Sequence, residues 1–561
     1  MKKHWIPLAA ILLLGGGAIF LAERRKADAP VSPASLLYFL ADTQRELTRL
    51  PASATRLSDA DEIRAGQQMA RRYNSQYQQK KNAEAREVET YVRMVGIRVA
   101  VRAHRKLPYS FHYIPDPDMI NAFSLPGGPV FIGEGLMMLM DSEDELASVL
   151  GHELEHIDHY HCAERLQIEA RTRQAGIFGI LAELPIEVFA AGYSKDQELE
   201  ADREGTRLAV QAGYSPTGAL RMFETFDRLF EEHIRKARTP QEELTSVALQ
   251  TLSGYFRSHP AMSDRSAQIR RMMEAEHWPI RPERDLEVAY IFRTIRARKA
   301  MEARRYDQAR KLAEQALQAR PDNLNALRVL AQAQWATADF AGAAATDRRV
   351  LDLSPTQASG YDYAHALAAA GNPARAVREF EQWMNSSRPL KDRGLEVPLA
   401  GLKLLAGDPA PAKAAVGRAK ASAEFWAPGW LGDLGWWYYR AGQYQTAAEL
   451  LNSAVQQRPG DTNFVAHLGW ANIELHNYRD ALSNFQAGSE PLMGRAVTLW
   501  LAQRQDEALS SYAQAATERP EWTNPRWVSA LYSPLVARTV ANMKAEQERR
   551  SKKPPVRAGN P

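Results

Sequence analysis

The hydrophobic and polar positions divide the chain into three parts with different patterns. An uncharged, mostly apolar run covers residues 5–22, between two lysines and the charged residues 23–26. Residues 59–280 combine long stretches of helical periodicity with one strand-like segment, YSFHYIPDPDMINAFSLPGGPVFIGEGLM. From residue 285 onward the apolar positions recur at helical spacing throughout. The pattern predicts a mainly α protein, in which an α+β domain with a small sheet precedes an all-α domain.

The apolar run near the N-terminus has almost the length that a membrane span needs. Its 18 residues, as a helix, cover about 27 Å, just short of the roughly 30 Å apolar core of a bilayer. Cleavage after Ala22 would place Phe20 where a signal peptidase needs a small residue, and Pro30 follows the next acceptable site. We therefore expect residues 1–26 to be a retained anchor, with a cleaved signal or a buried soluble helix as alternatives. A linker is expected over residues 27–58.

The second half repeats itself every 34 residues. The spacing separates Tyr306 from Phe340, Ala309 from Ala343, Pro321 from Pro355, Tyr444 from Tyr478 and Ala447 from Ala481. A small residue in the second helix and a proline after it are typical of tetratricopeptide repeats. We expect such a solenoid over residues 285–545, with degenerate units between 376 and 430 and a disordered basic tail at 546–561. Solenoids of this kind offer an extended surface to peptides or protein partners.

Charge and cysteine content narrow the choice of function. The net charge is only +4, and basic residues cluster only at the two ends, so we expect no nucleic-acid partner. Cys162 is the single cysteine, which excludes an intrachain disulfide and a zinc site built on several cysteines.

The segment LGHELEHIDHYHC contains an H-E-x-x-H motif, from His152 to His156. Residues i and i+4 of a helix lie on one face, so both imidazoles can reach one metal ion. A capping box formed by Ser142 and Glu145 predicts the start of that helix. Glu153 can then take a proton from a water molecule and deliver it to the leaving amine. The alternative is a surface helix with adventitious histidines.

A third ligand has to come from elsewhere, because catalytic zinc takes three protein ligands. A second capping box, at Ser194, predicts a helix in which Glu198 and Asp202 share one face. Glu198 can bind the metal, while Asp202 accepts a hydrogen bond from a ligand imidazole. We expect His161 to be buried near the site and His159 to be exposed, with neither of them a ligand.

The segment NAFSLPGGPVF predicts an edge strand, because Pro126 and Pro129 cannot donate hydrogen bonds inside a sheet. An edge strand near the metal can pair with an extended substrate backbone, which makes Asn121, Ala122 and Phe123 candidate substrate-binding residues. The alternative is a plain hairpin turn at Pro-Gly-Gly.

Four motifs in this order, NAFSLPGG, LGHELEH, QELEADREG and SHPAMSDR, resemble those of the zinc metallopeptidases of the HtpX and CAAX-prenyl-protease class. With the repeats added, the chain is similar to the BepA-type periplasmic proteases of bacteria. The resemblance implies a gluzincin-type zinc peptidase fold over residues 59–280 and one Zn²⁺ held by His152, His156 and Glu198. It also implies Glu153 as the catalytic carboxylate and Asp202 as the residue that orients a ligand.

Two residues of these motifs leave questions open. His259 belongs to a His-Pro pair that the resembled family shares, and it can stabilise the oxyanion, act as a fourth zinc ligand, or be an ordinary surface histidine. Glu155 places a charge inside the metal motif, where the family commonly has a small or apolar residue.

The resemblance implies a zinc endopeptidase of the bacterial periplasm that acts in protein quality control, anchored in the inner membrane or soluble after signal cleavage. Its repeats would recruit protein or peptide substrates, among them misfolded outer-membrane proteins, and their assembly machinery. One alternative is a chaperone or assembly factor for such proteins, with latent proteolysis. Another is a pseudo-protease with structural zinc, against which the intact Glu153 argues.

Overall fold

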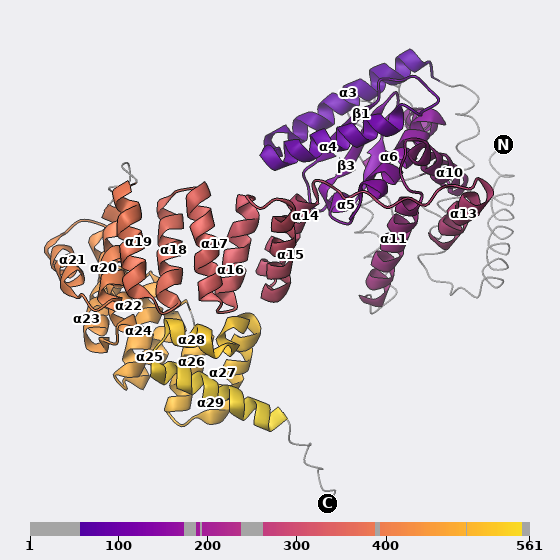
Figure 1. Cartoon of the computed structure of the whole chain (residues 1–561). Coiled ribbons are helices and arrows are strands. Elements are labelled where there is room, and N and C mark those ends of the chain that lie inside the picture. Colours follow the sequence, from indigo (N-terminus) through magenta and orange to yellow (C-terminus); the bar gives the residue numbers. More distant parts are fainter. Residues whose placement is uncertain are drawn as a thin grey trace, which may run out of the picture. The chain divides into compact units, whose positions relative to one another are not determined.

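The computed structural model describes residues 57–172, 187–190, 193–236, 262–386, 393–489 and 491–551. The chain divides into two compact units, residues 1–292 and 293–561 (Figure 1). The expected anchor or signal at residues 1–26 and the linker up to residue 56 lie outside the described residues. Within the described part, no helix is both long and apolar enough to span a bilayer.

The first unit consists of helices around a small sheet. Its helices are α3 (Asp59–Tyr77), α4 (Ala83–Ala100), α5 (Glu134–Met137), α6 (Glu143–Asp158), α7 (His161–Thr172), α9 (Glu187–Ala190), α10 (Lys195–Gln211), α11 (Thr217–Lys236) and α13 (Met262–Ala275). Its strands are β1 (Ser110–Ile114), β2 (Ala122–Ser124) and β3 (Pro129–Gly133). The predicted mainly α fold with a small sheet is confirmed.

The three strands form one sheet in the order β1-β3-β2. β1 runs parallel to β3, and β2 runs antiparallel to it, with Phe123 opposite Phe131. β2 is therefore an edge strand, in agreement with the sequence. The expectation that Pro129 also lies at an edge is wrong, because Pro129 is the first residue of the central strand. At that position the missing N–H removes no bond from the interior of the ladder.

Helix α6 is the centre of the first unit, and all 16 of its residues are buried. The predicted capping box is present: the Ser142 hydroxyl accepts from the Glu145 amide at 3.2 Å, and the Glu145 carboxylate accepts from the Ser142 amide at 2.8 Å. Helices α4, α10 and α11 and strand β2 pack around it. Because every face of α6 meets a neighbour, its side chains are held in fixed positions.

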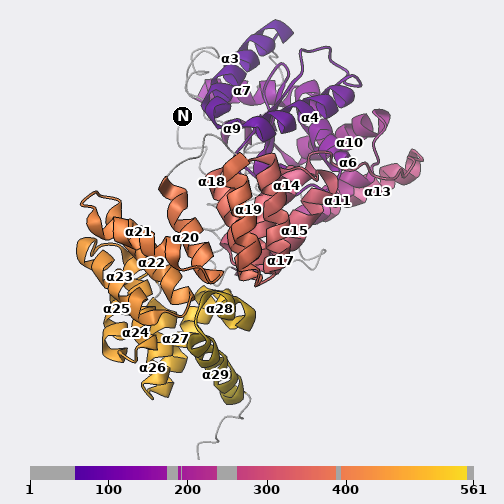
Figure 2. The same cartoon turned by 60° about the vertical axis from the view of Figure 1, so that its left-hand side comes forward.

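The second unit is entirely helical among its described residues. Its helices are α14 (Ala289–Glu302), which crosses the division between the units, α15 (Tyr306–Ala319), α16 (Leu324–Ala336), α17 (Phe340–Leu353), α18 (Gln357–Ala369), α19 (Pro373–Ser386), α20 (Glu396–Leu405), α21 (Ala410–Ala421), α22 (Ala427–Arg440), α23 (Tyr444–Gln457), α24 (Thr462–Glu474), α25 (Tyr478–Ala487), α26 (Pro491–Leu501), α27 (Gln505–Glu518), α28 (Pro525–Leu531) and α29 (Pro534–Ser551). Successive helices lie side by side in both views (Figures 1 and 2).

The 34-residue spacing corresponds to pairs of antiparallel helices. Each repeated aromatic residue, such as Tyr306 or Phe340, opens the second helix of a pair. The repeated alanines, Ala309 and Ala343, are fully buried where neighbouring helices meet. Because a larger side chain would force the helices apart, the alanine spacing indicates the packing directly.

The tail begins later than the sequence suggested. Residues 546–551, expected to be disordered, continue helix α29 to Ser551. Glu546 pairs with Arg549 and Arg550 within the helix, and Arg550 reaches Asp506 at 2.7 Å. Ion pairs at i+3 and i+4 spacing stabilise a helix. The prediction of a tail rested on the basic residues and did not take these pairs into account. Residues 552–561 lie outside the described part.

Candidate metal centre

The site forms where helices α6 and α10 cross at close range. A Cβ atom on Gly205 of α10 would lie 2.5 Å from the backbone nitrogen of His152, and one on Gly151 of α6 would lie 2.5 Å from the Gly205 carbonyl oxygen. Glycine at both positions therefore permits a contact that no other residue allows. This contact brings the first turns of α10, with Glu198 and Asp202, beside the two histidines of α6.

Three of the predicted residues meet at this crossing. Nε2 of His152 lies 3.1 Å from Nε2 of His156. The Glu198 carboxylate oxygens lie 3.4 Å from His152 Nε2 and 3.9 Å from His156 Nε2. Ligand atoms at zinc distances of about 2.0–2.1 Å are about 3.3 Å apart in a tetrahedron, so the observed separations fit a single ion. All three side chains are buried.

Hydrogen bonds at the outer ring nitrogens orient both imidazoles. Nδ1 of His152 lies 3.0 Å from a carboxylate oxygen of Asp202, and because a carboxylate only accepts, Nδ1 carries the proton. Nδ1 of His156 lies 2.9 Å from Nδ1 of His161, whose Nε2 donates to Glu200 at 3.2 Å. A neutral His161 then accepts from His156. In the neutral form of each histidine Nε2 is then the unprotonated nitrogen, which is the form that can bind a metal.

Asp202 is itself held by Arg265 of α13. The guanidinium donates to both carboxylate oxygens, with Nε at 2.5 Å from Oδ2, and the arginine is fully buried. Burial alone would raise the pKa of Asp202, but the charge of Arg265 and the bond from His152 hold it below its usual value. A charged Asp202 therefore accepts from His152 at all ordinary pH values.

The carboxylates also show that this site demands positive charge. Burial alone would lower the pKa of His152, but the hydrogen bonds to Asp202 and Glu198 outweigh it and raise the pKa to about 10. A proton on His152 or a bound metal ion can meet that demand.

Glu153 lies beside the ligands and bonds to the sheet. The Ser124 hydroxyl of β2 donates to Glu153 Oε2 at 3.0 Å. Burial raises the pKa of Glu153 to about 7, while His152 and Ser124 act in the opposite direction. A carboxyl that titrates near neutrality is suited to take up and return a proton.

The predicted substrate strand is covered in this structure. Asn121, Ala122 and Phe123 are at most 4% exposed. Helices α9 and α6 both pack against β2. The pairing of this edge with a substrate therefore stays a prediction.

Three further histidines were singled out in the sequence, and the structure describes two of them. His259 lies outside the described residues. His161 is buried near the site as expected, but His159 is half-buried rather than exposed, because its Nδ1 lies 2.9 Å from Glu155 Oε2.

Sequence reasoning missed four contributors to the site. Ser124 and Arg265 lie inside the motifs NAFSLPGG and SHPAMSDR, so the motifs marked their positions, but neither residue was given a role. His161 was placed but not given its bond to His156. Tyr193 left no signal: its ring stacks on His156 at 4.0 Å, and its amide donates to Glu198 at 3.0 Å.

Comparison with known proteins relates this region to a family. Residues 83–273, about a third of the chain, match the family described as Peptidase family M48. Residues 296–358 match a tetratricopeptide repeat family, which confirms the repeats in the second unit. The stretch that matches the peptidase family contains the cluster of His152, His156 and Glu198.

Curated relatives of the M48 domain include bacterial and mitochondrial proteases. A putative beta-barrel assembly-enhancing protease of Vibrio cholerae is 32% identical over 28% of this chain and 35% of its own. Mitochondrial metalloendopeptidase OMA1 of Schizosaccharomyces pombe is 34% identical over 23% of this chain and 41% of its own. The beta-barrel assembly-enhancing protease of Escherichia coli K12 is 24% identical over 42% of this chain and 55% of its own. The chain thus spans about a third to a half of the length of these relatives.

Proposed function

We propose that this protein is a zinc-dependent endopeptidase of the bacterial cell envelope, acting in protein quality control. The observation that carries the proposal is the meeting of His152, His156 and Glu198 in one buried cluster with Glu153 beside it. Two imidazoles and one carboxylate are the ligand set of many catalytic zinc sites, which keep one position open for water.

The ligand residues fit zinc in charge as well as in distance. Two neutral imidazoles and Glu198 would leave a site of net charge +1 around Zn²⁺. When bound, zinc supplies Lewis acidity, which polarises the scissile carbonyl and acidifies water. Asp202 and Arg265 keep His152 oriented, and His161 does the same for His156.

Glu153 performs the proton transfers in the proposed reaction. Its carboxylate takes a proton from the attacking water and passes it to the amine that leaves. Ser124 fixes one carboxylate oxygen, so the other can face the water. The edge strand β2 would align an extended substrate backbone, which requires the covering helix α9 to move aside.

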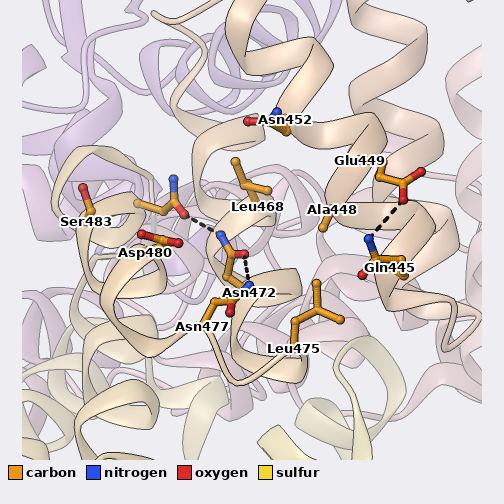
Figure 3. A pocket seen from close by; sticks show the side chains of 11 residues that line it. Gln445, Ala448, Glu449, Asn452, Leu468, Asn472, Leu475, Asn477, Asp480 and Ser483 are labelled. Carbon is orange, nitrogen blue, oxygen red and sulfur yellow. Dashed lines mark hydrogen bonds between the residues drawn. The ribbon is translucent and has the colours of Figure 1, made fainter.

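The repeats are proposed to recruit protein substrates or partners. One polar pocket of about 480 Å³ lies among α23, α24 and α25 (Figure 3). Asn472 donates to Asn484 at 3.0 Å there, and Gln445 donates to Glu449 at 3.0 Å. Carboxamides and carboxylates in such a pocket can bond a peptide backbone without reading its side chains.

The names of two relatives support a place in the envelope, because both are called beta-barrel assembly-enhancing proteases. We infer a periplasmic location, with residues 5–22 as the membrane anchor or signal. Misfolded outer-membrane proteins and their assembly machinery are the proposed substrates and partners.

A Glu153→Gln variant tests the proposal. It should keep its zinc, measured by metal analysis, and lose casein cleavage, because the amide cannot accept the proton. Full cleavage by this variant would remove Glu153 from the mechanism. If the inactive variant still supports outer-membrane assembly in cells, the alternative function as an assembly factor with latent proteolysis becomes the main one.

A further inference from the structure

Glu155, the charged residue inside the H-E-x-x-H motif, is not used by the zinc cluster. Its side chain is fully buried. His159 lies close, with Nδ1 at 2.9 Å from Oε2 and at 3.3 Å from the Glu155 carbonyl oxygen. His159 can therefore serve Oε2, whereas Oε1 has no donor among the described residues. A buried carboxylate oxygen without a hydrogen bond is costly, so Oε1 calls for a partner.

Two further side chains converge on Glu155. Asp158 stands three residues further along α6, and its side chain is 1% exposed. His104, in the loop between α4 and β1, places Nδ1 at 3.8 Å from Asp158 Oδ2. One donor atom from each of Glu155, Asp158 and His104 lies within 4.8 Å of the others.

We propose that Glu155, Asp158 and His104 form a second divalent-metal site, separate from the zinc cluster. Two buried carboxylates at such short range repel each other unless a cation lies between them. The imidazole selects a borderline metal such as zinc over magnesium or calcium, which prefer oxygen ligands. The 71% exposed side chain of His104 closes the site from the solvent side and leaves a route for the ion.

The neighbouring arginine does not replace the cation. The Arg105 guanidinium donates to the Ile157 carbonyl oxygen and to Asp59 and Glu62. Oδ2 of Asp158 accepts from the amides of His104 at 2.6 Å and Arg105 at 3.4 Å, and Oδ1 accepts from the Tyr109 hydroxyl. These bonds fix Asp158 and the loop in place, and Oδ1 keeps a second lone pair for a metal.

The site would fasten the α4–β1 loop to the C-terminal end of α6. A metal bound by residues from both elements stabilises the folded state, because the unfolded chain does not bring them together. His159 is the natural fourth ligand, since its ring already lies beside Glu155.

The test is a titration of the full chain with Co²⁺, followed by calorimetry and by the visible absorption of the ion. A His152→Ala/His156→Ala variant lacks the zinc cluster and should still bind one equivalent, whereas the wild type should bind two. Adding His104→Ala, which changes an exposed side chain and spares the fold, should weaken the remaining binding by at least about tenfold. Glu155→Gln should do the same, and His277→Ala, at another exposed histidine, should have no effect.

The outcomes separate this site from the proposed peptidase activity. No binding by the double variant, or binding unchanged by His104→Ala and Glu155→Gln, overturns the second site and leaves the zinc cluster untouched. Loss of casein cleavage in the double variant with one equivalent still bound supports both assignments.

Discussion

The pair formed by Asp202 and Arg265 provides the sharpest test of how the site is built. Both side chains are buried, at 3% and 0% exposure, so solvent screens their interaction little. Asp202→Asn removes the charge and leaves Arg265 as an uncompensated buried cation. Removing one partner of a buried pair costs about 3–5 kcal/mol, so we expect a loss of that size in the free energy of unfolding.

The same substitution should weaken zinc binding for a different reason. Asparagine can offer its NH₂ group where the carboxylate only accepted, so it no longer fixes the proton on Nδ1 of His152. Loss of such an orienting residue costs about 10–100-fold in metal affinity, which is about 1.4–2.7 kcal/mol.

A second substitution separates the two effects. In Asp202→Asn/Arg265→Met the buried cation is gone, so most of the stability should return, while the zinc affinity should stay low. Urea unfolding of the metal-free protein measures the first quantity, and competition with a zinc chelator measures the second. If Asp202→Asn costs less than about 1 kcal/mol, or if the double variant regains zinc affinity, the reasoning is wrong.

Three other predictions follow from single side chains. The pKa of Glu153 is raised from 4.5 to about 7, so between these pH values the metal-free folded state binds more protons than the unfolded chain. The free energy of unfolding, measured by urea unfolding at several pH values, should therefore fall as the pH rises from 4.5 to 7. Glu153→Gln should flatten this part of the curve. Gly205→Ala should force α6 and α10 apart, lower the free energy of unfolding by about 1–3 kcal/mol and abolish zinc binding. The control is Gly417→Ala, where a Cβ would meet nothing within 4 Å, and it should stabilise the protein by about 1 kcal/mol. Equal effects of the two substitutions in thermal unfolding and metal analysis would contradict the close crossing. Ala338 has φ 63°, so Ala338→Gly should raise the free energy of unfolding by about 1 kcal/mol. Gly371 has φ 84°, so Gly371→Ala should lower it by a similar amount. Melting temperatures that move in the same direction would disprove the assigned backbone strain.

The sequence predicts the local parts of this protein well. The i and i+4 spacing of His152 and His156 and the capping boxes at Ser142 and Ser194 follow from helix geometry, and the structure contains both helices. The 34-residue period gives the helical pairs of the second unit in the same way. Glu198 was predicted because a metal site with two ligands demands a third, which is a chemical argument that needs no coordinates, and the structure places it beside both histidines.

Contacts between distant segments were beyond that reasoning. The bonds of Ser124 to Glu153 and of Arg265 to Asp202 each join segments whose spacing follows no helical or strand period. The covering of β2 by α9 and the start of the tail after Ser551 also depend on packing.

What the sequence by itself determined is therefore the set of residues that can share one helical face, together with the chemistry that those residues make possible. The tertiary structure decided which faces meet: the crossing of α6 and α10 at Gly151 and Gly205, and the buried surroundings that raise the pKa of Glu153 to about 7. The physical reason is that a helix fixes the directions of its side chains through local backbone geometry. Burial and charge pairing, by contrast, are set by neighbours that only the folded chain brings close.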